Sequence, residues 1–120
     1  MFQLIDGLPA GVVGVRATGA VTKEDYATVL DPAVEAAARS GDPLRILFVV
    51  GPEFEKYTAG GILADTEEYG KLWEFCGRMA VVTDVWWIRD AVGLFRHALR
   101  GELRLYAYAD LDDARAWIAS

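Results

Sequence analysis

The sequence has little of the chemistry that metal and redox sites need. Cys76 is the only cysteine and His97 the only histidine among 120 residues. A single cysteine forms no disulfide within the chain and no Cys-x-x-Cys pair, and a single histidine gives poor support for a His-based metal site. We therefore predict no cofactor and no metal, with a site made of carboxylates alone as the one alternative that these counts leave open. The lack of an internal disulfide also fits a reducing cytoplasm.

Basic residues and long apolar runs are scarce as well. The chain has 12 Lys and Arg against 18 Asp and Glu, a formal net charge of −6. A nucleic-acid binder needs a basic face, so we expect no nucleic-acid partner, and the acidic balance also disfavours anionic membranes. No apolar run approaches the roughly 18 residues of a membrane span, and residues 1–11 lack the basic start of a signal peptide. We expect a cytoplasmic protein without a membrane span.

Hydrophobic residues, in contrast, are abundant. They make up 53% of the chain, and aromatic residues make up 12%. This composition excludes a disordered segment and suits one domain over residues 1–120. No nucleophile–base set emerges along the chain, so we expect a protein that is not an enzyme.

Periodicity and turn residues divide the chain into alternating strands and helices. Strands are predicted at residues 2–5, 12–20, 44–50, 79–83 and 103–109. Helices are predicted from Thr22 onward, from Gly60 or Gly61 to about Cys76, over 85–99, and after Asp110. The resulting order, β-β-α-β-α-β-α-β-α, predicts an α/β fold with a mixed, mostly parallel sheet of about five strands.

Capping and breaking residues refine this outline. Thr22 and Asp25 have the spacing of an N-terminal capping box. Pro32 either kinks one helix or begins a second helical segment. Asp84 and Asp110 are predicted N-caps, and Gly51 with Pro52 is predicted to open a loop. The closing helix places Trp117 on its apolar face.

Four segments of the chain, 14–37, 53–65, 77–87 and 102–118, resemble the SpoIIAA-like family, which belongs with the STAS and CRAL-TRIO type folds. The resemblance implies a sheet with its helices mainly on one face, and a regulatory or binding role. In the anti-sigma-factor antagonists of that family, a partner kinase phosphorylates a Ser in an Asp-Ser-Ser-Gly stretch. The matching stretch here reads Tyr57-Thr58-Ala59-Gly60. The resemblance thus makes Thr58 a candidate phosphoacceptor, although Tyr57 and Ala59 depart from the pattern.

The candidate ligand or partner surface combines this stretch with aromatic residues nearby in the predicted fold. Its members are Phe54, Tyr57, Thr58, Gly60, Gly61, Asp65, Trp86 and Trp87. Thr58 is alternatively a helix cap, and the aromatic residues fill a core, line an apolar cavity or form a dimer contact. Trp86 and Trp87 are adjacent, so they cannot share one helix face, and we expect one to enter the core while the other lies at the surface or lines a groove. Either Trp87 or Ile88 begins the inward face of the helix predicted over 85–99. Arg96, His97 and Arg100 either cap a helix end or bind an acidic partner.

The function that these features favour is a small non-enzymatic regulatory or protein-interaction domain with a protein partner. The alternative is a binding module for a lipid-like or other apolar molecule. Four Trp residues in a chain of 120 also lead us to expect a homo-oligomer.

Overall fold

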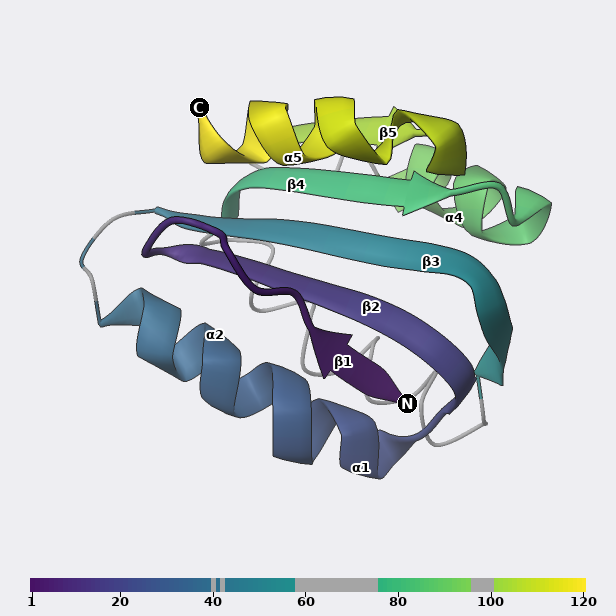
Figure 1. Ribbon diagram of the computed structural model, residues 1–120, viewed down its shortest axis with the longest axis horizontal. Helices are drawn as coiled ribbons and strands as arrows, with labels where there is room; N and C mark the ends of the chain where they lie inside the picture. The colour runs from purple at the N-terminus through teal and green to yellow at the C-terminus, as the bar shows by residue number, and fades with distance from the viewer. Residues whose placement is uncertain (40, 42, 58–75, 96–100) are drawn as a thin grey trace.

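Five strands form one sheet in the order β1-β2-β3-β4-β5 (Figure 1). The computed structural model describes residues 1–39, 41, 43–57, 76–95 and 101–120. The strands are β1 (Phe2–Leu4), β2 (Val12–Val21), β3 (Leu44–Tyr57), β4 (Cys76–Thr83) and β5 (Glu102–Tyr106). β1 is antiparallel to β2, and every later pair is parallel. The predicted α/β fold with a mixed, mostly parallel sheet is confirmed.

The described helices connect or follow these strands in the predicted order. They are α1 (Lys23–Asp25), α2 (Asp31–Ala38), α4 (Trp86–Phe95) and α5 (Leu111–Ala119). A π-helical turn joins α1 to α2, and a 3-10 turn precedes α5. The helix predicted between residues 60 and 76 lies outside the described residues. None of the described helices is long and apolar enough to cross a membrane.

Side chains alternate between two apolar layers, one on each face of the sheet. On one face, Ile46 and Val50 pack with Tyr26, Leu30 and Ile88 from the helical run before β3 and from α4. The opposite face carries a smaller cluster, in which Leu47, Val49 and Val82 contact Ala114 and Ile118 of α5. The helices therefore lie mainly on one face, as predicted, with α5 alone among those described on the other (Figure 1).

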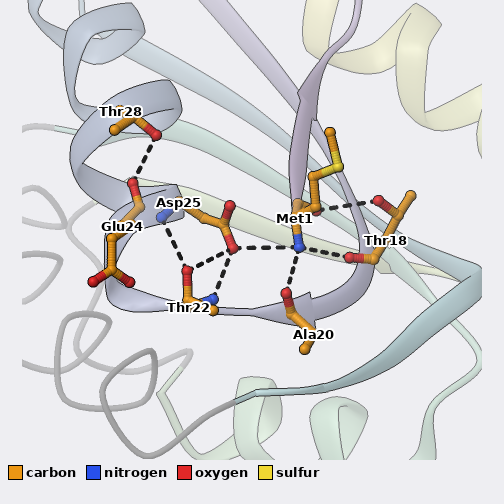
Figure 2. Close-up of polar contacts among 7 residues, drawn as sticks. All are labelled: Met1, Thr18, Ala20, Thr22, Glu24, Asp25 and Thr28. Atoms are coloured by element: carbon orange, nitrogen blue, oxygen red, sulfur yellow. Dashed lines mark hydrogen bonds and ion pairs between the residues drawn. The ribbon is translucent and has the colours of Figure 1, made fainter.

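The first helical segment begins at the capping box that the sequence predicts (Figure 2). The Thr22 backbone N–H donates to Asp25 Oδ2 at 2.7 Å, and the Asp25 N–H donates back to Thr22 Oγ1 at 3.4 Å. The Met1 ammonium lies 3.3 Å from the same carboxylate oxygen and donates to the carbonyls of Thr18 and Ala20. Burial alone would raise the pKa of Asp25, but the Thr22 donors and the ammonium outweigh it and hold the pKa below its ordinary value of 3.8.

The break predicted at Pro32 takes the form of a π-helical turn over Tyr26–Leu30. The Asp31 N–H donates to the carbonyl of Tyr26, five residues earlier rather than four. Pro32 then stands at the start of α2, where its missing N–H matters least. Both interpretations of Pro32 thus hold in part: the helical run continues, and a second α-helical segment starts at this point.

The loop predicted after residue 50 is wrong, because β3 continues through Gly51 and Pro52 to Tyr57. Beyond Val50 it pairs with β2, with Phe54 opposite Gly19 and Tyr57 opposite Val21. A register shift separates the Ala17–Val50 pair from the Gly19–Phe54 pair, and Pro52 lies at this irregularity. A proline is tolerated at such a point because no ladder hydrogen bond is required of it.

Three other details of the sequence prediction change at the last strand and its neighbours. β5 ends at Tyr106 and not at residue 109, since Tyr108–Asp110 form a 3-10 turn. Asp110 occupies the N-cap position of α5, but its side chain makes no capping hydrogen bond. Asp84 was predicted as an N-cap, but its carboxylate accepts from the N–H of Tyr108. The hydroxyl of Thr83 accepts instead from the N–H of Val85.

Candidate interaction surface

The candidate surface lies at the carboxyl end of the parallel strands. The far end of β3 and the start of α4 meet at the same end of the sheet (Figure 1). They are close because β4 ends at Thr83, where it pairs with Val50, and α4 begins three residues later. This end of the sheet is therefore built from β3, the β4–α4 connection and the turn after β5.

Three aromatic rings from β3 and α4 form a cluster at this end. The ring centroid of Trp87 lies 6.3 Å from that of Phe54 and 6.0 Å from that of Tyr57. The Phe54 and Tyr57 centroids are 5.3 Å apart. These distances and tilted arrangements are typical of favourable aromatic pairs. The cluster fixes α4 against the extended part of β3.

Trp86 does not join this cluster. Its side chain is 73% exposed, and Trp87 itself is 40% exposed. The expectation that one of the two tryptophans enters the core is wrong, because Ile88 takes the inward position on α4 with only 6% exposure. An exposed tryptophan beside three packed aromatic rings gives the surface a substantial apolar area.

A shallow depression of about 220 Å³ adjoins the start of α4. Its lining combines apolar groups with one carboxylate and consists of Val50, Gly51, Pro52, Asp84, Val85 and Tyr108. Gly51 is essential to this shape, because a Cβ at that position would lie 2.6 Å from the Tyr108 ring. Tyr108 was not predicted to line this surface, because residue 108 falls inside the strand predicted over 103–109.

Two arginine side chains link the strands beneath this surface by hydrogen bonds. Arg89 of α4 donates to the carbonyl of Thr83 at 2.8 Å and to that of Tyr106 at 3.4 Å, which ties the ends of β4 and β5 together. Arg16 of β2 donates to the Tyr108 hydroxyl at 3.0 Å. Both guanidinium groups thus satisfy oxygen atoms at the strand ends.

The remaining candidate residues fall where the structure gives no description. Thr58, Gly60, Gly61 and Asp65 lie outside the described residues, as do Arg96, His97 and Arg100. Of the candidates that are described, Phe54, Tyr57 and Trp87 come together and Trp86 stands apart. Within the described ranges, no group of three or more His, Cys, Asp or Glu residues is arranged to hold a metal ion.

Comparison with known proteins identifies the family. The sequence matches the family model described as SpoIIAA-like over residues 12–119. The chain belongs to the SpoIIAA-like family. No curated protein matches it.

Two solved structures share the fold of this SpoIIAA-like chain. An uncharacterised DUF3478-family protein from Shewanella loihica PV-4, with a SpoIIAA-like fold, superposes with a TM-score of 0.75 at 18% identity, covering 98% of this chain and 92% of its own. The anti-sigma factor antagonist SpoIIAA in its unphosphorylated form gives a TM-score of 0.59 at 15% identity, covering 94% of this chain and 96% of its own. At these identities the likeness concerns the fold.

Proposed function

We propose that this SpoIIAA-like chain is a small, non-enzymatic protein-interaction domain with a regulatory role in the cytoplasm. The proposal extends to this chain the kind of role named for SpoIIAA, an anti-sigma factor antagonist with the same fold. The observation that carries it is the exposed aromatic surface, with Trp86 73% and Trp87 40% exposed beside the rings of Phe54 and Tyr57. Tryptophan and tyrosine are enriched where proteins bind each other.

Thr58, Gly60, Gly61 and Asp65 remain in the proposal as sequence predictions, and Thr58 directly follows Tyr57 in the chain. Phosphorylation of Thr58 would add nearly two negative charges to the residue that follows Tyr57 in the chain. Added charge of that size changes the affinity for a partner through repulsion or new ion pairs. Thr58→Glu is therefore expected to alter partner binding while leaving the thermal stability of the domain unchanged.

The test compares partner capture by the wild-type chain and by a Trp86→Ser/Trp87→Ser double variant in extract from the source organism. We expect a protein that the wild type retains and the double variant loses. Leu4→Ser is the matched control, because Leu4 is 53% exposed but lies on β1, away from the surface. Equal retention by all three proteins, or no specific retention by any, would contradict the proposal.

The proposal has a second arrangement, in which the partner is another copy of this chain. The same aromatic surface then holds a homo-oligomer together. Tryptophan-rich patches serve homodimer contacts as readily as contacts with other proteins. Sedimentation of the wild type and the double tryptophan variant separates the two arrangements by mass.

An apolar ligand is the alternative function, and the depression beside Gly51 favours it. Its volume of about 220 Å³ and its mainly apolar lining suit part of a small apolar molecule. An apolar fluorescent probe displaced by fatty acids, and excluded by Val85→Trp, would support this function. Unchanged probe fluorescence with the wild type would count against it.

A further inference from the structure

We propose that the outward face of α4 docks a basic amphipathic helix of a partner protein. The inference rests on the proposed function and specifies the site and the chemistry of the partner. The face, which we call the α4 outer face, consists of Trp86, Asp90, Gly93 and Leu94, with Trp87 along its margin.

Helical geometry places these residues on one side of α4. Val85, Ile88 and Val92 pack against the core, and Arg89 reaches the strand ends. Positions 86, 90 and 94 follow at intervals of four and so point the other way. Trp86 and Leu94 are about 12 Å apart along the axis, slightly more than two helical turns.

This face is open and apolar to an unusual degree. Of the five large hydrophobic side chains that the structure records as exposed among the described residues, three belong to α4: Trp86, Trp87 and Leu94, the last at 80%. A Cβ built on Gly93 meets nothing within 4 Å. Gly93 places no side chain beside Leu94, which leaves this side of the helix open to a side chain of a partner.

Charge indicates what occupies the face. Asp90 lies midway between Trp86 and Leu94, and within the described part of the chain its carboxylate makes no ion pair. Burying Asp90 under an apolar partner would leave an uncompensated charge, so the partner has to supply Lys or Arg near the centre of the contact.

The same carboxylate argues against a second copy of this chain. A two-fold axis that packs Trp86 of one α4 against Leu94 of the other passes beside residue 90. The two Asp90 carboxylates would then approach each other in an interface from which water is excluded, and like charges there reduce the binding free energy. A different protein with a basic, apolar helix satisfies both requirements at once.

The test is a selection of helical peptides from a displayed library against the full chain. Peptides enriched on the wild type and not on Trp86→Ser should combine apolar residues at helical spacing with Lys or Arg. We expect Trp86→Ser and Asp90→Lys each to weaken the best peptide by at least about tenfold, a loss that corresponds to one desolvated contact.

Matched controls separate local from general effects. Asp112→Lys makes the same change of charge at an exposed position on α5, and we expect it to change the affinity by less than about twofold. Replacing the peptide's Lys and Arg by Glu should abolish binding to the wild type and restore it to Asp90→Lys. All of these positions are exposed, so thermal melts close to that of the wild type are expected to show that the variants fold. Asp112→Lys should lower the melting temperature slightly, because it replaces an acid in the first turn of α5 by a cation.

Several outcomes would overturn the inference. They are enriched peptides that are acidic or uncharged, binding that the α4 variants do not affect, a wild-type dimer that Trp86→Ser dissociates, and Trp86-dependent binding to vesicles of phosphatidylcholine and phosphatidylglycerol. Peptides that bind elsewhere on the chain would overturn this inference and leave the proposed function standing. A chain that captures no protein partner in the extract experiment would instead count against the proposed function.

Discussion

At the scale of the single residue, Gly51 has no room for a side chain. A Cβ there would lie 2.6 Å from Cε2 and 3.1 Å from Cζ of Tyr108. The Tyr108 ring cannot move away freely, because Tyr108 is held at two points. Its hydroxyl accepts a hydrogen bond from Arg16, and its backbone N–H donates to Asp84. Overpacking at such a position displaces the ring and its hydrogen bond together.

We therefore expect Gly51→Ala to lower the free energy of unfolding by about 1–3 kcal/mol, the usual cost of overpacking. Gly93→Ala is the matched control: its Cβ meets nothing, and alanine in a helix gains about 0.5–1 kcal/mol over glycine. Urea denaturation of both variants checks the pair. A Gly51→Ala protein as stable as the wild type would show that Tyr108 moves at no cost.

Asp25 also acts at this scale, through the pH dependence of stability. Its folded-state pKa lies below the ordinary value of 3.8, because the hydrogen bonds from Thr22 and the Met1 ammonium outweigh the effect of burial. A carboxyl group with a lowered folded pKa stabilises the fold above its unfolded pKa, and this stabilisation is lost as the pH falls through the folded value.

The stability difference between wild type and Asp25→Asn should therefore be largest near about pH 7 and shrink below about pH 4. Urea denaturation at a series of pH values measures it. A difference that stays constant down to about pH 2 would mean that the carboxylate charge contributes nothing to the capping box.

At the scale of the element, α5 alone among the described helices covers its face of the sheet. Ile118 and Ala114 are fully buried there, whereas Trp117 is partly exposed, with Arg104 4.6 Å from its ring centroid. Arg45 and Arg78 donate to the carbonyls of Ile118 and Trp117, near the end of the helix. The helix is thus held by two buried side chains and by arginines at its carboxyl end.

Ile118→Ala should lower the free energy of unfolding by about 2–5 kcal/mol, since it removes buried methylene groups and leaves a cavity. Trp117→Ala should cost less, because part of that ring already faces water. Thermal melts rank the two variants. A larger loss for Trp117→Ala would mean that its contacts with Arg78 and Arg104 outweigh burial.

The elements also show which local sequence patterns were sufficient to predict the structure. Thr22 and Asp25 predicted the capping box because the spacing of such a box is local and specific. Gly51 and Pro52 led to the wrong prediction of a loop. Glycine and proline open loops, but glycine also permits close packing and proline also occurs at irregular points of strands. A local pattern cannot distinguish these uses, since the deciding partners, Tyr108 and Gly19, are distant in sequence.

For the site, the sequence predicted the aromatic residues but not their arrangement. α4 carries apolar residues on every side, so periodicity could not decide between Trp87 and Ile88 for the inward position. Asp90 and Leu94 were missed as surface residues for the same reason. Their one signal was the interval of four from Trp86.

At the scale of the whole molecule, the net charge of −6 acts on any basic partner before contact is made. The field of an acidic protein speeds the approach of a cationic one, and salt screens this field over a Debye length of about 10 Å at 0.1 M. Contact formation at the α4 outer face, in contrast, depends on Trp86, Leu94 and Asp90 at close range. The association rate of a basic partner therefore depends on the net charge of the chain, whereas its dissociation rate depends on the residues of the α4 outer face.

The last prediction separates these two contributions in the kinetics of a basic amphipathic peptide selected as described above. Raising the salt from about 0.02 M to about 0.5 M should lower its association rate constant by about tenfold or more, with a smaller change in the dissociation rate constant. Asp112→Lys should slow association slightly through the reduced net charge, whereas Asp90→Lys should chiefly speed dissociation, because it places two like charges in contact. Surface plasmon resonance at several salt concentrations measures both constants. If Asp112→Lys and Asp90→Lys changed them alike, the peptide would be responding to overall charge, and the α4 outer face would have no special part in holding it.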